Sequence, residues 1–484
     1  MPEVFGPYVN GRWLVDAGRR SLAVTNPASG EVVGMVREAT LEDVDVAFQA
    51  AEQAFSSWRR VSPTERGALL HRAAEILERD IEEMSRLLTL EQGKPLVDAR
   101  KELATTARIL HLYAEEATRI EGVSQRGAAG NTFSVAVRQP VGPCALIGPW
   151  NYPVELLAFK LGPALAAGCS AVMKPPNETP LTVLRLARCF EAAGAPRGLV
   201  NVLVGAGETI GEAMIKHPLA RKVAFTGSTA VGRRVASLAS AALKPTTLEL
   251  GGNAPFIVFD DADLELAVAG ATRRSYSNAG QICIAVNRVY VQRRVYTEFL
   301  DALVARVDRL VVADGLKVPQ ADMGPVINDR AVAELDERVS DATRKGAKVI
   351  RGGRRLTGAE YQRGSFYAPT ILTGVDEGMR VMSEESFGPI TPVAVFDTPD
   401  EVIARANATG YGLAAYVYTR DLNLALRAAE ELQCGGVGIN VNDVTELSMP
   451  FGGWKESGYG RELGRYGLEN YLQWKHVRIL LPQP

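Results

Sequence analysis

The order of apolar segments between residues 141 and 251 constrains the fold more than any other feature of this sequence. Four short apolar runs, CALIG, SAVMK, NVLVG and KVAFTG, each have the pattern of a buried strand that ends in a loop, and helical patterns separate them. Consecutive parallel strands need helical crossovers, so this order predicts a parallel sheet with helices on both faces. A second alternating region runs from APFIVFDD at residue 254 to AAYVYT at residue 414. We therefore expect an α/β protein with two doubly wound domains.

Two other kinds of segment flank these regions. Residues 40–119 carry apolar residues at spacings of three and four, and Ser62-Pro63-Thr64-Glu65 is a helix start signal, so the opening of the chain should be helical. SQRGAAGNTFSVAVRQPVG, residues 124–142, and YLQWKHVRILL, residues 471–481, alternate without an obvious place in either core. Such strands predict an arm that pairs with another subunit.

Composition excludes several classes of protein. With 54 basic and 56 acidic residues the formal net charge is −2, so no nucleic-acid footprint is expected. No segment approaches the roughly 20 apolar residues of a spanning helix and the N-terminus lacks a leader pattern, so we expect no membrane partner and a cytoplasmic location. Five scattered cysteines without CxxC spacing and four unpaired histidines favour neither a disulfide framework nor a metal site. Acid and base chemistry should therefore fall to carboxylates or cysteine.

The segment YSNAGQICIAVNR, residues 276–288, presents the first candidate for chemistry. A cysteine in an apolar, β-prone run is ordinarily a small buried hydrophobe. Here Asn278, Gly280 and Gln281 interrupt the run with a turn, which would present the Cys283 thiol at the end of an element. A thiolate that attacks an aldehyde gives a thiohemiacetal, whose carbon can then lose hydride. Cys283 is therefore a candidate nucleophile.

The segment LELGGNAP, residues 248–255, places Glu249 between two leucines. This glutamate is either a solvated strand residue or a carboxylate held in an apolar site. The two glycines that follow it permit close backbone approach and support the second alternative. Burial would raise the pKa of Glu249 and suit it to general-base work.

Two segments earlier in the chain carry polar residues at strand or helix ends. In GPWNYP, residues 148–153, Asn151 is either a helix N-cap or the amide of an oxyanion site. In VMKPPNETP, residues 172–180, Lys174 closes a buried strand. It is either a lysine that snorkels from a sheet edge or a residue at the carboxyl end of a parallel strand, where nucleotides bind.

Two further segments suggest contacts with a nucleotide. FTGSTAVGRRV, residues 225–235, leads from a strand through Gly227 and Ser228 to a helix whose first amides could hold a pyrophosphate, although the spacing does not match GxGxxG. EESFGPI, residues 384–390, contains a Gly-Pro turn and an acidic residue that could bind ribose hydroxyls, with a plain surface turn as the alternative.

In this order and spacing the six segments resemble the aldehyde dehydrogenase superfamily, from about Pro27 through PFGGWKESGYGRELG to the C-terminus. The LELGGNAP and YSNAGQIC motifs match the two active-site patterns of that family without a break. The resemblance implies that Cys283 is the nucleophile, Glu249 the base for deacylation and Asn151 the oxyanion donor, with Lys174 counted in the same catalytic set. It also implies the cofactor NAD or NADP, held by Ile147, Pro149, Trp150, Lys174, Asn177, Gly207, Gly211, Phe225, Thr226, Gly227, Ser228, Val231, Gly232, Leu250, Glu385 and Phe387.

The same resemblance implies the organisation of the chain. A Rossmann-like cofactor domain would comprise residues 1–121 and 142–251, and an α/β catalytic domain residues 252–456. Residues 122–141 and 468–484 would form a small β arm for oligomerisation, and the assembly would be a homodimer or homotetramer. Glu249 sets the chain apart from relatives that transfer the acyl group to coenzyme A, so hydrolysis is expected. The alternative from another class is a catalytically silent binding or structural protein on the same fold, which the retained Cys283, Glu249, Asn151 and Lys174 disfavour.

The sequence defines the substrate less closely than it defines the reaction. LTLEQGKP and LELGGNAPFIVFDDADL resemble the succinate-semialdehyde dehydrogenase branch, but Phe159 and Ser277 stand where that branch carries its substrate arginines. Without a guanidinium a buried substrate carboxylate would be poorly compensated. Tyr152, Leu156, Phe159, Ile284 and Phe451 favour an uncharged aromatic or medium-chain aldehyde. Glu155 and Glu446 keep an aminoaldehyde as an alternative, beside succinate semialdehyde.

The cofactor preference depends on the residue three positions after Lys174. NAD-preferring relatives commonly carry glutamate there, which repels a 2′-phosphate, whereas this chain has Asn177 with Glu178 beside it. An amide removes the repulsion and Lys174 adds a positive charge, so we expect NADP to be tolerated.

Overall fold

The computed structural model describes residues 4–128 and 130–482, so the outer limits of the predicted domains at residues 1 and 484 lie outside it. Its first sheet has eight strands in the order β20-β12-β11-β8-β9-β10-β2-β3. The four apolar runs are strands as predicted: β8 (Cys144–Ile147), β9 (Ala171–Lys174), β10 (Val200–Val202) and β11 (Lys222–Thr226). They run parallel to one another and to β12 (Thr246–Glu249). The edges are antiparallel: β2 (Tyr8–Val9), β3 (Arg12–Trp13) and β20 (Gly458–Tyr459).

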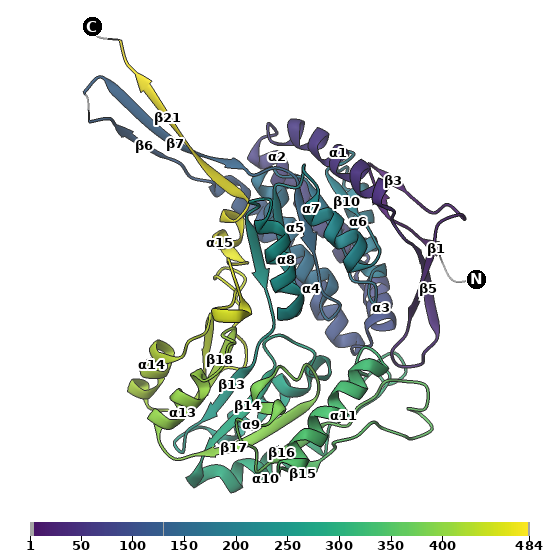
Figure 1. Ribbon diagram of the computed structural model, residues 1–484, viewed down its shortest axis with the longest axis vertical. Coiled ribbons are helices and arrows are strands. Elements are labelled where there is room, and N and C mark those ends of the chain that lie inside the picture. The colour runs from purple at the N-terminus through teal and green to yellow at the C-terminus, as the bar shows by residue number, and fades with distance from the viewer. Residues whose placement is uncertain (1–3, 129, 483–484) are drawn as a thin grey trace.

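The order of the five parallel strands reverses beside β8. From β8 the chain first builds outward through β9 and β10, then returns to the other side of β8 with β11 and β12. A crevice forms at the carboxyl ends of the strands at such a switch point, and it is where nucleotides bind in open α/β sheets. The connections are α5 (Pro153–Ala167), α6 (Leu181–Ala192), α7 (Glu212–Lys216) and α8 (Thr229–Ser240), which lie over the sheet (Figure 1).

The opening of the chain is helical, as predicted. Its helices are α1 (Leu41–Trp58), α2 (Pro63–Arg79), α3 (Ile81–Gln92) and α4 (Leu96–Glu116). Capping boxes begin α1, through Thr40 and Asp43, and α2, through Ser62 and Glu65. A three-stranded sheet precedes these helices and has no counterpart in the sequence predictions: β1 (Val4–Phe5), β4 (Ser21–Thr25) and β5 (Val32–Arg37).

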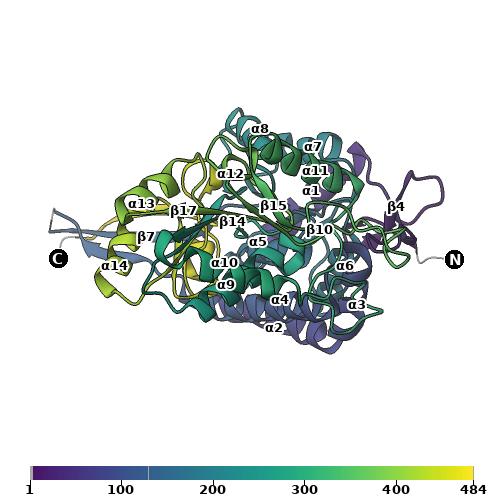
Figure 2. The same cartoon turned by 90° about the horizontal axis from the view of Figure 1, so that it is seen from below.

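The second α/β region forms a seven-stranded sheet in the order β15-β16-β17-β14-β13-β18-β19. Its strands are β13 (Ala254–Val258), β14 (Val286–Gln292), β15 (Lys348–Arg351), β16 (Thr370–Thr373), β17 (Ile390–Phe396), β18 (Ala414–Tyr418) and β19 (Gly436–Ile439). All neighbours except β15 and β16 are parallel. The helices around it are α9 (Leu264–Tyr276), α10 (Tyr296–Val307), α11 (Asp329–Arg344), α12 (Arg380–Ser383), α13 (Pro399–Asn407) and α14 (Leu422–Glu431). This layer lies below the first sheet in Figure 1, and Figure 2 views the molecule from that side.

The orphan segments form a sheet that projects from the body (Figure 1). Residues 122–141 contain two strands rather than one, β6 (Val123–Arg126) and β7 (Thr132–Pro140). The C-terminal strand β21 (Leu472–Leu480) pairs antiparallel with β7 over nine residue pairs, following α15 (Gly464–Glu469). This arm sheet exposes Trp474, Val477, Ile479 and Leu480. Among the described residues, none of the helices has both the length and the apolar character needed to cross a membrane.

Candidate active site

Two cavities meet at Cys283. One is a tunnel of about 410 Å³ between α4, α5 and α9, and the other a cleft of about 590 Å³ at the carboxyl ends of β8 and β11. Cys283, Asn151 and Leu156 line both cavities. A molecule in the tunnel and another in the cleft would therefore approach the same sulfur from two sides.

A tight turn presents the sulfur between the cavities. Asn278 and Ala279 have φ angles of 49° and 54°, and Gly280 follows with 69°. At Gly280 a Cβ atom would lie 2.2 Å from the carbonyl oxygen of Gly388, so only glycine fits. Left-handed backbone at residues other than glycine is costly and concentrates at functional sites. The predicted turn before the thiol is thus present, in a more strained form than the sequence pattern indicated.

Asn151 does not cap α5, since Tyr152 occupies the N-cap position and no side chain caps that helix. Its side-chain amide instead donates to the carbonyl oxygen of Gln281 at 2.9 Å. Its Oδ1 atom has no hydrogen-bond partner in the described part of the chain. Lys94, which sequence reasoning missed, donates from Nζ to the Asn151 carbonyl oxygen at 2.8 Å and forms a buried ion pair with Glu102. The amide of Asn151 is therefore held beside the turn that carries Cys283.

Glu249 is the carboxylate in an apolar site rather than a solvated strand residue. Its side chain is buried and neither carboxylate oxygen has a hydrogen-bond partner among the described residues. Burial raises the pKa of Glu249 well above its usual value, and the nearby Glu462 adds to this, while Lys160 and Arg461 oppose it. Lys160 donates to Thr226 at 2.6 Å and to Glu462 at 2.7 Å. A base with a raised pKa can take a proton near neutral pH.

The Cys283 thiol is half-buried and neutral in the resting arrangement. Burial raises its pKa to about 12, and the charges of Glu385 and Glu249 contribute in the same direction. Arg274, at the end of α9, opposes this shift. The reactive thiolate must therefore form when a substrate or cofactor changes the surroundings of the sulfur.

The cleft has the features that a dinucleotide needs. Helix α8 begins at its wall, where Gly227 and Ser228 provide amides for a phosphate. Asn177 faces the cleft with an Oδ1 atom that lacks a partner among the described residues, as an adenosine ribose site would require. Glu385 accepts from the Gly252 amide at 3.0 Å, and Phe387, with a φ of 47°, contacts Trp150 edge-on. The residues present thus fit a nicotinamide dinucleotide.

Most of the predicted cofactor residues line this cleft. They are Ile147, Pro149, Trp150, Lys174, Asn177, Gly207, Phe225, Thr226, Gly227, Ser228, Val231, Leu250, Glu385 and Phe387. Gly211 and Gly232 lie behind the wall, where a Cβ atom would meet Lys174 and Leu250 respectively. Sequence reasoning missed a second wall formed by α11, which contributes Ala331, Glu334, Leu335 and Arg338. Their periodicity is that of any amphipathic helix, so no local signal could have assigned them to the cleft.

Lys174 does not sit at a sheet edge. Strand β9 is central, between β8 and β10, and the lysine is 5% exposed. Its Nζ donates to the carbonyl oxygen of Pro175 at 3.1 Å, and burial lowers its pKa to about 8. Of the two alternatives for Lys174, a lysine at a sheet edge or a residue at the carboxyl end of a parallel strand, the structure agrees with the second, which favours contact with a nucleotide.

The tunnel is lined by all eight predicted substrate residues: Tyr152, Glu155, Leu156, Phe159, Ser277, Ile284, Glu446 and Phe451. Phe159 and Phe451 meet edge-on with ring centroids 6.3 Å apart. The sequence analysis missed the charged residues from α4 and α9, notably Arg108, Arg273 and Arg274. The buried guanidinium of Arg274 is already engaged, because it pairs with Asp443 at 2.7 Å and donates to the Asn442 carbonyl oxygen at 2.6 Å. Strand order and helix packing, rather than spacing in the chain, bring these residues into the tunnel.

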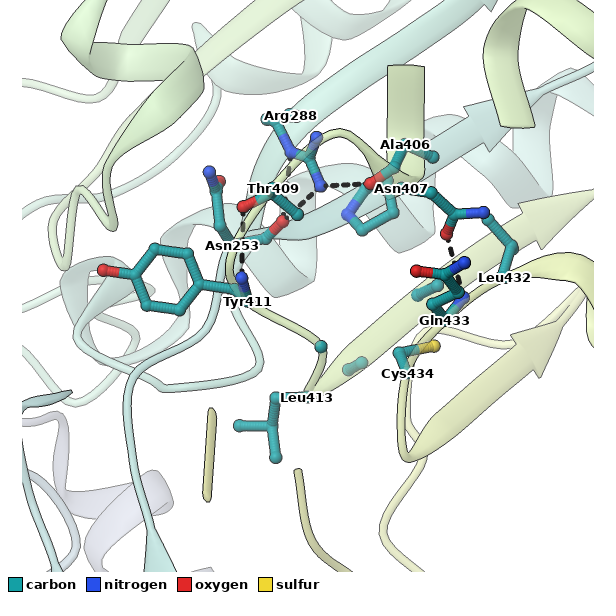
Figure 3. A pocket seen from close by; sticks show the side chains of 14 residues that line it. Asn253, Arg288, Ala406, Asn407, Thr409, Tyr411, Leu413, Leu432, Gln433 and Cys434 are labelled. Carbon is teal, nitrogen blue, oxygen red and sulfur yellow. Dashed lines mark hydrogen bonds between the residues drawn. The ribbon is translucent and has the colours of Figure 1, made fainter. Parts of the chain in front are cut away.

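A third cavity, lined by residues that include Pro255 of β13, Arg288 of β14 and Ala406 of α13, is too small for an organic ligand (Figure 3). It holds about 10 Å³, enough for a single water molecule. The buried Arg288 beside it donates to the carbonyl oxygens of Asn253 at 2.8 Å and Ala406 at 3.0 Å. This arginine links the segment after Glu249 to the strand after Cys283 and to the end of α13, and so braces the two catalytic segments against each other.

The comparisons with known proteins agree with this geometry. Residues 13–477 match the model of the aldehyde dehydrogenase family. The chain is 42% identical over 471 residues to the succinate-semialdehyde dehydrogenase [NADP(+)] of Escherichia coli, with 97% of each chain covered. It is also 42% identical over 470 residues to the 3-sulfolactaldehyde dehydrogenase of Pseudomonas putida, covering 97% of this chain and 96% of that one.

Solved structures extend the agreement to the fold. The betaine aldehyde dehydrogenase of Staphylococcus aureus in complex with NAD+ has a TM-score of 0.96 at 37% identity, with 99% of this chain and 95% of that chain covered. A family match over nearly the whole chain and relatives well above 30% identity leave no other assignment. The chain belongs to the aldehyde dehydrogenase family of NAD(P)-dependent oxidoreductases.

Proposed function

We propose that this protein oxidises an aldehyde to a carboxylate through a thioester on Cys283, which water activated by Glu249 then hydrolyses. The observation that carries the proposal is that Cys283 and Asn151 line both the tunnel and the cleft. A nucleophile at this junction can hold the substrate carbon while a cofactor in the cleft takes the hydride from it.

In the first half-reaction the Cys283 thiolate attacks the aldehyde carbon, and the carbonyl oxygen takes the negative charge. The Asn151 amide, fixed by its hydrogen bond to Gln281, supplies a second N–H for this oxygen. A nicotinamide bound in the cleft would supply the acceptor for the hydride that the thiohemiacetal carbon loses. The product of this half-reaction is a thioester on Cys283.

In the second half-reaction Glu249 takes a proton from a water molecule, whose oxygen adds to the thioester carbon. The C–S bond then breaks, the carboxylic acid leaves and loses its proton to solvent, Glu249 returns its own proton to solvent, and the Cys283 thiolate is regenerated. The apolar surroundings of Glu249 support this role, because they raise its pKa and leave both of its oxygens free to accept a proton.

The tunnel favours an uncharged aromatic or medium-chain aldehyde. Its lining includes Leu156, Phe159, Ile284 and Phe451, which match an apolar chain or ring. The buried arginine in the tunnel, Arg274, is neutralised by Asp443 and so offers little to a substrate carboxylate. The names of the relatives keep an anionic semialdehyde as the second candidate.

The residues that line the cleft are compatible with both NAD and NADP. Asn177 and Lys174 border the cleft where an adenosine ribose would lie, and neither repels a 2′-phosphate. Glu178 also lines the cleft and is the acidic residue that would oppose NADP if its side chain turned towards the ribose. Apolar side chains are exposed on both faces of the arm sheet, Trp474 and Leu480 on one and Val477 and Ile479 on the other, which suits pairing with a second copy of the chain as a homodimer or homotetramer.

The test is reduction of nicotinamide, followed by absorbance, with benzaldehyde, hexanal, an aminoaldehyde and succinate semialdehyde. Wild type should show the higher kcat/KM with the two apolar aldehydes, and Cys283→Ala and Cys283→Ser should show no turnover. Turnover of wild-type size in either variant would exclude Cys283 as the nucleophile. A clear preference for succinate semialdehyde would exclude the apolar substrate while leaving the reaction itself intact.

A further inference from the structure

Glu155 is a carboxylic acid without a partner in the wall of the tunnel. It lies in the first turn of α5, next to Leu156 and one turn before Phe159, and it is half-buried. Its backbone N–H donates to Glu102 at 3.4 Å. Its side-chain carboxyl group makes no hydrogen bond or ion pair with the residues that the structure describes.

Most of the other acidic residues that line the tunnel already have an ion-pair or hydrogen-bond partner. Asp98 pairs with Lys101 at 3.1 Å. Glu102 pairs with Lys94 and accepts from the Val154 amide at 3.1 Å. Asp443 pairs with Arg274. Glu446 remains, but it is exposed to solvent, so water satisfies it.

Glu155 is therefore the tunnel acid for which an unmade hydrogen bond is costly. A half-enclosed polar group needs a partner, and once a substrate fills the tunnel and displaces water, that partner has to come from the substrate. The surrounding apolar residues, Leu156 and Phe159, belong to the same helix face. The expected substrate is thus apolar along most of its length and polar at one point.

The charges around Glu155 decide which polar group fits. The pKa of Glu155 is raised to about 8, chiefly by burial; Glu102 on α4 and Asp443 after β19 contribute to this rise, and Lys94 and Arg108 oppose it. At neutral pH the group is mainly the uncharged acid, which both donates and accepts a hydrogen bond. A hydroxyl group matches both functions, whereas an ammonium group needs the ionised carboxylate.

We propose that Glu155 is a specificity-determining residue that binds a hydroxyl group at the end of the substrate remote from the aldehyde, so that the preferred substrate is a hydroxylated apolar aldehyde. This inference rests on the proposed function and deepens it. The hydroxyl group of the substrate would bind to the wall of the tunnel that α5 forms, and the reaction at Cys283 would stay as proposed above.

The experiment compares matched pairs of aldehydes: hexanal with 6-hydroxyhexanal, and 4-ethylbenzaldehyde with 4-(hydroxymethyl)benzaldehyde. Wild type should show a kcat/KM about three- to tenfold higher for the hydroxylated member of the pair that reaches Glu155, the size expected of one hydrogen bond. Glu155→Leu should lose this preference, so that the kcat/KM values of the two members of the pair become equal, and its thermal unfolding midpoint reports whether the variant is folded. Glu155→Gln retains both a donor and an acceptor and should keep most of the preference.

Three outcomes would overturn the inference. Equal kcat/KM values within each pair in wild type, with hexanal oxidised normally, would refute the role of Glu155 and leave the proposed function standing. Loss of the preference in Glu446→Leu but not in Glu155→Leu would show that Glu446, rather than Glu155, recognises the hydroxyl group. A preference for 6-aminohexanal that grows from pH 7 to pH 9 and vanishes in Glu155→Gln would identify the ammonium ligand instead. Failure of wild type to oxidise any of these aldehydes would refute the proposed function itself.

Discussion

The side-chain amide of Asn151 donates a hydrogen bond to the carbonyl oxygen of Gln281, 2.9 Å away and two residues before Cys283. These two residues come from different parts of the fold: Asn151 precedes α5, and Gln281 ends the strained turn between α9 and β14. The bond joins the proposed oxyanion donor to the segment that carries the proposed nucleophile. It leaves the second amide hydrogen for a substrate oxygen.

Replacement of Asn151 by alanine should lower kcat by about 10²–10³, because the charge on the substrate oxygen loses a positioned donor. Asn151→Asp should be at least as damaging, since a carboxylate repels the oxyanion. The measurement is the steady-state rate with a saturating aldehyde, with the thermal unfolding midpoint as a control. A variant that unfolds at much lower temperature than wild type would mean that the bond to Gln281 serves the fold rather than the reaction.

Glu249→Gln should transfer hydride once and then stop. The amide cannot take a proton from water, so the thioester persists after the first half-reaction. A single-turnover burst of reduced cofactor, together with an acyl-enzyme mass, would establish this. An undiminished steady-state rate would show that another group activates the water.

The pH dependence of hydrolysis follows from the raised pKa of Glu249. The base must be ionised to act, and a raised pKa keeps it protonated to a higher pH, so kcat should increase with pH over a range above that in which an ordinary glutamate ionises. The increase of kcat with pH should disappear when added hydroxylamine releases the thioester, because hydroxylamine does not need the base. If the increase persists with hydroxylamine, it arises from a different step of the reaction.

Alkylation of Cys283 by iodoacetamide in the absence of cofactor should be slow at pH 7 and increase steadily to pH 10. The pKa of about 12 leaves a very small thiolate fraction, which grows tenfold per pH unit below the pKa. Because the ionised Glu385 helps to raise this pKa, Glu385→Gln should accelerate alkylation at pH 9, by less than about tenfold. Fast alkylation of wild type that reaches a plateau near pH 7 would contradict the neutral resting thiol.

Asn177→Glu should shift the cofactor preference towards NAD. The new carboxylate would face the 2′ position and repel a phosphate there, a change of about 1–3 kcal/mol for a charge-bearing contact. The ratio of kcat/KM for NAD and NADP, measured for both proteins at one ionic strength, tests it. Strict NAD specificity in wild type that the substitution leaves unchanged would show that Asn177 does not face the 2′ position.

The sequence by itself determined the elements and the chemical groups. Strands such as β8, β9 and β11 are continuous apolar runs because they are buried on both faces, and the capping box at Ser62 and Glu65 satisfies the free amides of a helix start whatever the helix packs against. The motifs around Cys283 and Glu249 similarly point to these residues as the proposed nucleophile and base, because a thiol after a glycine turn and an acid between leucines are unusual locally.

The tertiary structure decided which groups meet. Glu102 and Lys94 on one side, and Arg274 and Asp443 on the other, carry no local mark of a substrate site, yet helix packing and strand order place all but Lys94 along the tunnel. The Glu155 acid is isolated only because those neighbours pair with one another. Two strands rather than one in residues 122–141, and the wall that α11 gives the cleft, likewise depend on contacts between residues far apart in the chain. Side-chain periodicity records whether a residue is buried, but the identity of the group that it faces is set only when distant elements pack together.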